Sequence, residues 1–295
     1  MTIRELLAEG RTLFSSANFS TANIENPALD AALLLARVLN TSREGLIING
    51  GKTVSGIDRK KFHKLLKRRL GGECTAYILH LKEFMGLDFF VNSHVLVPRP
   101  DTEILAETAL KAGDSASNGS GGIALLDLCT GSGALPVSLK HQRPSWEIWA
   151  ADISARALKT ARKNALRLLA QPGGIHFIKS DLYGKLKTKK GRRRFDIIVS
   201  NPPYVASARM EELAPEIKRE PRLALDGGED GLVFTRRIIR EAPLYLKPEG
   251  RLLLEADPEQ MENITVMLKD SHFSDIKREK DLSGNERVIE GKLEH

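Results

Sequence analysis

The sequence predicts an α/β protein in which a small helical bundle precedes a mostly parallel sheet with an antiparallel last strand pair. Three observations support this fold class. Apolar residues recur at helical spacing over about the first 70 residues. After residue 122, seven short apolar segments alternate with helical patterns. The turn Ser283-Gly284-Asn285 between the last two segments is too short for a helical crossover, so those strands are expected to pair antiparallel.

Length and composition exclude several classes of protein. At about 150 residues per domain, 295 residues suggest two domains. A content of 41% hydrophobic and 28% charged residues argues against a disordered or collagen-like chain. No apolar stretch is long enough to cross a membrane, and Glu5 and Glu9 interrupt any apolar signal segment. Cys74 and Cys129 provide neither a disulfide framework nor metal-ligand spacing, so we expect a cytoplasmic protein without a metal.

The charge balance is basic but moderate. Lys and Arg number 45 against 38 Asp and Glu, which gives a net charge of +7. Such a surface is compatible with nucleic acid or with a partner associated with nucleic acid. Part of the excess is local, because residues 185–194 hold seven cations and no anion. We interpret this run as a solvated loop between two elements.

The N-terminal region has the pattern of a helical bundle. A first helix is indicated by apolar residues at helical spacing, namely Ile3, Leu6, Leu7, Leu13 and Phe14. Asn26 followed by Pro27 predicts an N-cap and a second helix through Leu39. A third helix is predicted over about residues 57–70 and ends at two glycines. We assign residues 1–83 to a helical N-terminal domain.

A connector is predicted between the bundle and the sheet. Apolar residues lie on either side of Asn92-Ser93, which is typical of a short hairpin. Residues 84–97 are therefore expected to form a β-hairpin connector, and Pro98 and Pro100 end any strand there. Residues 98–292 form the predicted second domain.

The second domain alternates strands and helices. The predicted strands are Ile123–Leu128, Glu147–Ala151, Ile175–Ser180, Asp196–Ser200, Arg251–Glu255, Asp275–Lys280 and Arg287–Glu290. The helices that stand out are Ser154–Leu169, Leu232–Leu246 and Pro258–Ser271. Continuous apolar strands such as residues 197–199 imply burial on both faces, as in a parallel sheet. Residues 114–122 are rich in Ser and Gly and are expected to form a mobile linker.

The first chemical motif follows the first of these strands. It consists of Cys129, Thr130, Gly131, Ser132 and Gly133, and a helix is predicted from about Ala134. Glycines at such a turn allow a ligand to approach the backbone, and the helix N-terminus favours negative charge. A single Gly-x-Gly is weak evidence by itself, because many turns between a strand and a helix contain it for packing.

Acidic residues at two further strand ends strengthen this interpretation. Asp152 follows the next strand, where doubly wound folds place a carboxylate on ribose hydroxyls. Asp181 follows the third strand and is positioned to accept from an adenine amino group, with Leu182 available to cover the ring. Together these residues predict an adenosine-type cofactor. The missing third glycine of a dinucleotide fingerprint argues against NAD.

The second motif, Asn201-Pro202-Pro203-Tyr204, indicates the chemistry. The Asn201 side-chain oxygen and the Pro202 carbonyl could accept hydrogen bonds from the two N–H groups of a planar NH₂ group, and the prolines remove competing N–H donors. Tyr204 would supply a flat wall. The held nitrogen could then attack a sulfonium methyl group in line. Positioning can contribute about 7–11 kcal/mol, so no His, Cys or Lys base is required. We predict that Asn201 and Pro202 are catalytic.

Taken together, these motifs resemble those of amino-group methyltransferases that use S-adenosyl-L-methionine. Nearly the whole chain resembles the peptide chain release factor glutamine methyltransferases, the HemK/PrmC family. The segments that support the resemblance are Arg99–Glu103, Glu220-Pro221, Ala224-Leu225, Gly228–Leu232, Leu254-Glu255 and Asp281–Gly284 with Arg287. The resemblance implies a seven-stranded, Rossmann-like methyltransferase sheet behind a helical domain that binds substrate. It also implies N5-methylation of the glutamine in the Gly-Gly-Gln loop of release factors.

The resemblance also assigns roles to individual residues. It places the turn from Cys129 to Gly133, Asp152 and Asp181–Leu182 at the cofactor, and Asn201 at both cofactor and substrate. Pro202 to Tyr204 would complete the glutamine pocket. The family has glycine where Cys129 stands, so the loop is expected to lie slightly differently and the thiol to pack rather than react. Glycine is also expected at His80 and Asp257. The implied partners are release factors, with a monomeric enzyme and no stable nucleic-acid or membrane binding.

Three alternatives remain at this point. The same pocket would serve an enzyme that methylates a ribosomal-protein glutamine, and only residues 99–103 favour the release factor. Exocyclic amines of DNA adenine or rRNA guanine also fit the acceptor pair. Such enzymes must expose the base, and the N-terminal segment lacks the basic, aromatic-rich face this requires. A cofactor-binding scaffold without catalysis is the least favoured reading.

Overall fold

The chain divides into two compact units. The computed structural model describes residues 1–17, 21–116, 122–170, 173–188 and 191–294. One unit comprises residues 1–81 together with 211–220, and the other comprises residues 82–210 together with 221–295. The first boundary lies close to the end expected for the helical domain at residue 83. The return of the chain to the first unit at residues 211–220 has no counterpart in the sequence prediction.

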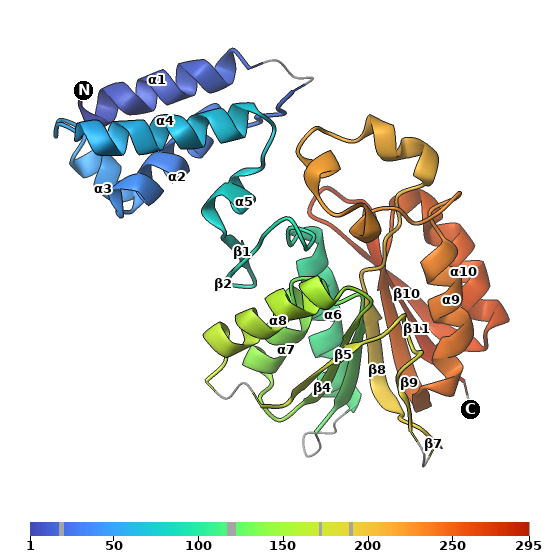
Figure 1. Ribbon diagram of the computed structural model, residues 1–295. Coiled ribbons are helices and arrows are strands. Elements are labelled where there is room, and N and C mark those ends of the chain that lie inside the picture. Colours follow the sequence, from blue (N-terminus) through green and yellow to red (C-terminus); the bar gives the residue numbers. More distant parts are fainter. Residues whose placement is uncertain (18–20, 117–121, 171–172, 189–190, 295) are drawn as a thin grey trace. The chain divides into compact units, whose positions relative to one another are not determined.

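The first unit is a bundle of helices (Figure 1). They are α1 (Ile3–Ser15), α2 (Pro27–Leu39), α3 (Arg43–Ile48), α4 (Gly56–Leu70) and α5 (Thr75–Leu79). The predicted cap of α2 is present, because Asn26 accepts a hydrogen bond from the Leu29 N–H at 3.0 Å. Leu6, Phe14 and Phe62 are among the buried side chains of its core. Helices α3 and α5 were too short for apolar periodicity to predict.

Residues 211–220 are attached to these helices through a buried arginine. Arg69 is 4% exposed, and its Nε donates to Asp30 Oδ2 at 2.7 Å. Its Nη1 lies 3.7 Å from Glu216 Oε2, and Glu216 accepts from the Asn23 N–H at 3.1 Å. A buried guanidinium is tolerated only when it is paired in this way. Arg69 therefore fixes the segment that contains the short helix η2 (Ile217–Arg219).

The second unit begins with a hairpin whose turn differs from the prediction. Strands β1 (Lys82–Phe84) and β2 (Leu87–Phe89) pair antiparallel around Met85 and Gly86, which both have positive φ. Two such residues match the right-handed twist of a hairpin. The expected turn at Asn92-Ser93 is wrong. There, Asn92 Oδ1 accepts from the His94 N–H at 2.9 Å, which makes a local side-chain turn without strand pairing.

The main sheet has seven strands in the order β10-β11-β9-β8-β3-β4-β5. Their bounds are β3 (Ala124–Leu128), β4 (Glu147–Asp152), β5 (Ile175–Lys179), β8 (Phe195–Ser200), β9 (Leu246–Glu255), β10 (Phe273–Lys280) and β11 (Glu286–Leu293). Strand β11 is antiparallel to both β10 and β9, and the other neighbours are parallel. The predicted fold class is confirmed.

Helices cover both faces of the sheet. They are α6 (Asp101–Ala116), α7 (Ala134–Gln142), α8 (Ala155–Leu168), α9 (Val233–Glu241) and α10 (Met261–Asp270). Leu125 and Ile197 pack on the face covered by α6, α7 and α8, whereas Leu126 and Ile198 pack on the face covered by α9 and α10 (Figure 1). Adjacent strand residues thus serve opposite layers, which explains why these strands are continuously apolar.

Several predicted boundaries shift. The helix expected through Leu246 ends at Glu241, and the one-turn helix η4 (Ala242–Leu244) follows it. Strand β9 therefore begins at Leu246 instead of Arg251, with an irregularity in its pairing to β8. The sequence pattern did not single out α6, which takes up residues 114–116 of the expected linker. Residues 117–121 of that linker lie outside the described residues.

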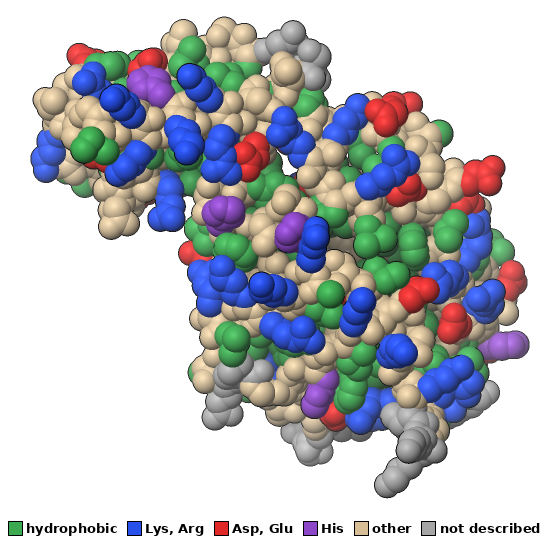
Figure 2. All heavy atoms as spheres, in the orientation of Figure 1, with side chains coloured by type: hydrophobic (Ala, Val, Ile, Leu, Met, Phe, Trp, Pro, Cys, Tyr) green, Lys and Arg blue, Asp and Glu red, His purple; other side chains and the backbone are tan. Residues whose placement is uncertain are grey.

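The remaining elements are short. They are β6 (Lys187–Thr188), β7 (Gly191–Arg192), η1 (Ser207–Glu212), η3 (Arg222–Ala224) and η5 (Pro258–Gln260). The predicted basic loop thus contains the small β6–β7 pair, and its residues 189–190 are outside the described part. On the face in Figure 2, Lys and Arg side chains are spread among other side chains instead of forming one continuous patch. Among the described residues, no helix combines the length and apolarity needed to cross a membrane.

Candidate active site

A pocket lies in the second unit where β3, β4, β5 and β8 end. Its lining includes the strand-end residues Cys129, Gly131, Asp152, Asp181, Leu182, Asn201 and Pro203. The sequence analysis predicted all of these as site residues. The structure therefore brings together residues from four strand ends. In open α/β sheets, this edge is where ligands bind.

Five other predicted residues do not line this pocket. They are Thr130, Ser132, Gly133, Pro202 and Tyr204. Gly133 has φ 78°, and a Cβ there would lie 2.9 Å from Ala161 Cβ, so glycine lets α7 approach α8. Gly131 differs, because a Cβ there would meet no atom closer than 3.9 Å and its φ of 54° is the constraint. The backbone at Gly131 is thus open to a ligand, as a cofactor loop requires.

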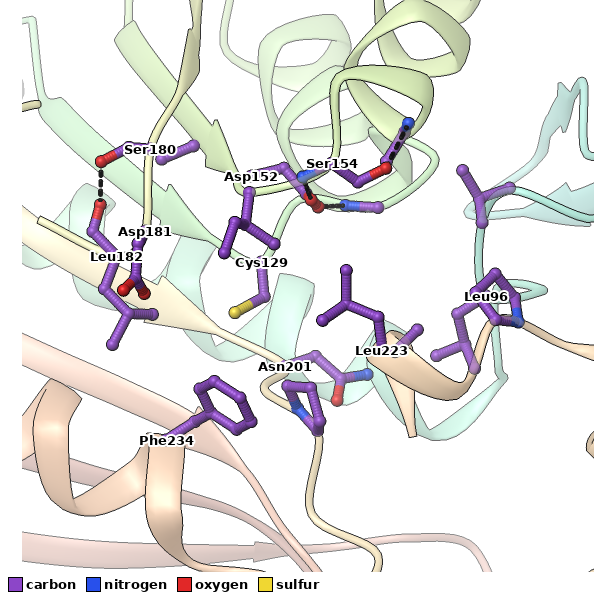
Figure 3. A pocket seen from close by; sticks show the side chains of 18 of the residues that line it. Leu96, Cys129, Asp152, Ser154, Ser180, Asp181, Leu182, Asn201, Leu223 and Phe234 are labelled. Carbon is purple, nitrogen blue, oxygen red and sulfur yellow. Dashed lines mark hydrogen bonds between the residues drawn. The ribbon is translucent and has the colours of Figure 1, made fainter. Parts of the chain in front are cut away.

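Asp152 links this turn to the end of β4. Its Oδ2 accepts from the Gly131 N–H at 2.8 Å and its Oδ1 accepts from the Ser154 N–H at 2.8 Å (Figure 3). Burial raises the pKa of the carboxyl group, while the two backbone N–H groups act in the opposite direction. Both oxygens are consequently held in fixed directions. A carboxylate oriented in this way is suited to accept hydrogen bonds from a diol.

Cys129 occupies a backbone conformation that favours glycine. Its φ is 63°, in the left-handed region, where an ordinary residue is strained by about 1–2 kcal/mol. Burial, and then the negative charge of Asp152, raise the pKa of its thiol. A thiol that stays protonated is a weak nucleophile. This supports the expectation that Cys129 packs in the site and does not react.

The third strand end carries Asp181 and Leu182. Leu182 has φ 44°, and the turn is held by Ser180, whose hydroxyl donates to the Leu182 carbonyl at 2.7 Å. Asp181 accepts from Arg237 Nη2 of α9 at 2.9 Å, a partner that the sequence analysis did not anticipate. Figure 3 places Asp181, Leu182 and Phe234 on one side of the cavity. Leu182 and Phe234 therefore supply apolar surface beside a carboxylate.

Asn201 begins the loop after β8. Its Nδ2 donates to Thr102 Oγ1 of α6 at 3.0 Å. Within the described part of the chain, no hydrogen bond is accepted by Asn201 Oδ1, so this oxygen remains available. Further along the loop, the Tyr204 hydroxyl donates to Glu255 Oε1 at 3.5 Å, and burial raises the pKa of Tyr204. The carboxamide is thus tied at its nitrogen and open at its oxygen.

Besides Phe234 and Arg237 of α9, two chain segments in the pocket wall were missed by sequence reasoning. They are residues 94–96 and the region that contains Pro221, Leu223 and Ala224. The buried Asn164 of α8 holds the chain at Phe90, a few residues before the first segment. Its Oδ1 accepts from the Phe90 N–H at 2.8 Å, and its Nδ2 donates to the Ser132 carbonyl at 2.9 Å. An asparagine on the apolar face of α8 is the sequence feature that could have indicated this link.

Family models match most of both units. The PrmC N-terminal domain matches residues 5–79, and the methyltransferase small domain matches residues 102–233. The release factor glutamine methyltransferase of Burkholderia pseudomallei is 39% identical over 269 residues, which cover 90% of this chain and 92% of that protein. The chain belongs to the release factor glutamine methyltransferase family. The Clostridium botulinum relative of the same name is 34% identical and is matched over 99% of both chains.

Solved structures agree with the fold. A methyltransferase from Pyrococcus furiosus aligns with a TM-score of 0.51 at 20% identity, covering 71% of this chain and 90% of that one. The catalytic domain of hMettl16 aligns with a TM-score of 0.55 at 14% identity, covering 75% and 78%. These likenesses concern the fold, and the family match above makes the protein an S-adenosylmethionine-dependent methyltransferase. Among the described residues, no group of three or more His, Cys, Asp or Glu is arranged to hold a metal.

Two positions where the family resemblance led us to expect glycine behave differently. His80 ends α5 with φ 56°, a left-handed conformation in which glycine is favoured. Asp257 has φ −67°, so its backbone does not require glycine. Instead, its side chain accepts from the Glu259 N–H at 3.0 Å and caps η5. The two departures thus have different structural consequences.

Proposed function

We propose that this protein transfers a methyl group from S-adenosyl-L-methionine to the side-chain nitrogen, N5, of the glutamine in the Gly-Gly-Gln loop of peptide chain release factors. The names of its relatives support the substrate class. The observation that carries the chemistry is the Asn201 carboxamide in the pocket. Its nitrogen donates a hydrogen bond to Thr102, and its oxygen is left to accept a hydrogen bond from another amide.

The residues of the pocket fit this cofactor. The oriented Asp152 carboxylate suits the ribose hydroxyls, and the backbone at Gly131 leaves room for close approach. Leu182 and Phe234 offer apolar surface for the adenine ring, beside Asp181 for its amino group. When bound, S-adenosylmethionine would supply an electrophilic methyl carbon. The amide nitrogen would form a bond to this carbon as the carbon–sulfur bond breaks, and the methylated nitrogen, made acidic by alkylation, would lose one proton to water.

The task of the protein is to orient a poor nucleophile. The lone pair of an amide nitrogen is delocalised, so the plane and position of the group decide its reactivity. Asn201 Oδ1 and the Pro202 carbonyl would accept hydrogen bonds from its two N–H groups, and the prolines offer no competing N–H. Holding reactants in place can contribute about 7–11 kcal/mol, against about 1 kcal/mol for one neutral hydrogen bond. Orientation by the Asn201 loop is therefore the main contribution.

The partners follow from this reaction. Release factors are the protein substrates, and the cytoplasm, where translation ends, is the proposed location. We propose a monomeric enzyme that makes no stable complex with nucleic acid. The helical unit, residues 1–81 with 211–220, is proposed to dock the release factor.

The experiment is incubation with labelled S-adenosylmethionine and, separately, a release factor, ribosomal proteins, rRNA and DNA. Mass spectrometry should find one methyl group on the glutamine of the release factor. Asn201→Ala should bind the cofactor almost as well but turn over roughly 10²–10³ more slowly, as when one group that stabilises a transition state is lost. Label in DNA, rRNA or a ribosomal protein alone would overturn the substrate, and unchanged turnover of Asn201→Ala would overturn the role of Asn201.

A further inference from the structure

Two segments that support the family resemblance, 99–103 and 254–255, contribute no side chain to the lining of the pocket. The structure brings them together beside the Asn201 loop, outside the lining of the pocket. Thr102 comes from the start of α6, and Glu255 comes from the end of β9. Both side chains are buried, with Thr102 7% exposed and Glu255 1% exposed. A buried carboxylate next to a catalytic loop requires a physical explanation.

The hydrogen bonds form a short chain that ends at Asn201. Thr102 Oγ1 accepts from Asn201 Nδ2 at 3.0 Å, so the hydroxyl hydrogen of Thr102 is free to be donated elsewhere. Burial chiefly raises the pKa of Glu255 and the Thr102 hydroxyl lowers it, and Glu255 Oε2 is a buried oxygen without a hydrogen-bond partner among the described residues, so this oxygen is the acceptor open to Thr102. Glu255 Oε1 also accepts from the Tyr204 hydroxyl at 3.5 Å. Glu255 thus contacts both a partner of Asn201 and the last residue of its loop.

The direction of this chain decides which end of the carboxamide the substrate meets. If Thr102 donates to Glu255, its oxygen can only accept, and Asn201 must turn its NH₂ group toward it. Asn201 Oδ1 is then presented to the substrate. In the reversed orientation, the NH₂ of Asn201 would face the NH₂ of the substrate amide, and neither could accept.

We propose that Thr102 and Glu255 are positioning residues for methyl transfer, which fix the Asn201 carboxamide with its oxygen toward the substrate amide. This inference rests on the proposed function of Asn201. It predicts that the pair acts on turnover and not on cofactor affinity, because neither side chain lines the pocket.

The charges around Glu255 are balanced by an arginine. Burial is the main cause that raises the pKa of Glu255, Asp101 of α6 raises it further, and Arg287 of β11 lowers it. Arg287 Nε lies 2.9 Å from Asp281 Oδ2 and 3.3 Å from Asp101 Oδ2. The segment 281–287, which also belongs to the family resemblance, is thus linked to the segment 99–103 by the ion pair of Arg287 with Asp101.

The test compares Thr102→Val with Thr108→Val. The first change preserves shape but removes the acceptor for Asn201. Thr108 is a matched control, because it is on the same helix, is 5% exposed and donates only within α6, to the Ile104 carbonyl. In Thr102→Val, kcat with the release factor should fall roughly 10- to 100-fold, as for a misplaced reacting group, while the dissociation constant of S-adenosylmethionine stays within about twofold. Thr102→Ser should restore most of the activity, and Thr108→Val should retain it.

A second measurement is independent of the substrate. The side-chain NH₂ of Asn201, assigned by its absence in Asn201→Asp, should exchange with water faster in Thr102→Val than in the unmodified protein, and normally in Thr108→Val. Equal kcat and equal exchange in both valine variants would overturn the positioning role. If the unmodified enzyme does not methylate release factors, the proposed function fails. A selective rise in exchange in Thr102→Val would still support the hydrogen-bond chain.

Discussion

Replacing Glu255 with glutamine should stabilise the second unit at alkaline pH. Burial is the main cause that raises the pKa of this carboxyl group from its ordinary value of 4.5 to about 7. The folded state therefore favours the neutral form. Between these two pH values the folded protein binds more protons than the unfolded chain, so the contribution of Glu255 to stability is lost as the pH rises through this window.

The size of the effect follows from the same numbers. The difference between 4.5 and about 7, at about 1.4 kcal/mol for each pH unit, corresponds to about 3 kcal/mol at pH 8 or above. Glu255→Gln has no charge to bury and escapes this cost. Below pH 4.5 the two proteins should differ little. Glu255→Gln should therefore make the protein more stable at alkaline pH, and it should also make the enzyme less active because Asn201 is less well oriented. Such a loss of activity with a gain of stability is expected at a functional site.

Both tryptophans of the chain, Trp146 and Trp149, lie in the second unit, so their fluorescence reports its unfolding. Urea unfolding of both proteins from pH 5 to pH 8.5 gives the difference in free energy of unfolding. Glu290→Gln is the control, because Glu290 is also buried but is paired with Arg251, and its loss should destabilise the protein. A stability difference for Glu255→Gln that does not grow with pH would refute the reasoning.

Two further predictions concern the cofactor turn. At position 129, glycine should be more stable than alanine by about 1 kcal/mol, because the left-handed backbone costs alanine more than flexibility costs glycine. The control is the exposed Leu166 inside α8, where alanine should be more stable than glycine, and thermal unfolding in which alanine is also more stable than glycine at position 129 would contradict this. Asp152→Ala should raise the dissociation constant of S-adenosylmethionine roughly 10- to 100-fold in calorimetry, whereas Asp114→Ala on the exposed end of α6 should not. An unchanged constant for Asp152→Ala would exclude the ribose role.

The sequence was most informative where function depends on strand ends. Asp152, Leu182 and Asn201 each follow an apolar strand directly, and parallel strands bring such positions to one edge of the sheet. Register and order of the strands were not needed to place these residues in one pocket. The fold class could be predicted for the same reason, since alternation of strands and helices determines it.

Sequence reasoning failed where distant segments meet. The pairing of Thr102 with Asn201 joins residues on α6 and after β8, and no local pattern indicates it. Asn164 likewise bridges segments that the chain separates widely. The hairpin turn was misplaced for a different reason. β-Branched residues lie on both sides of Asn92 and predict strands there, whereas the strands that pair are the short segments on either side of Gly86. Tertiary packing outweighed the β-propensity of the residues around Asn92.

The division of the chain at residues 211–220 limits how the protein can be taken apart. A fragment that starts at residue 82 would keep this stretch but remove Arg69 and Asn23, which hold Glu216. Residue 220 is joined directly to Pro221, which lines the candidate pocket together with Leu223. Deleting or exchanging the helical bundle would therefore leave residues 211–220 without the helices on which they pack. An exchange of the helical unit between two relatives must therefore include residues 1–81 and residues 211–220 together.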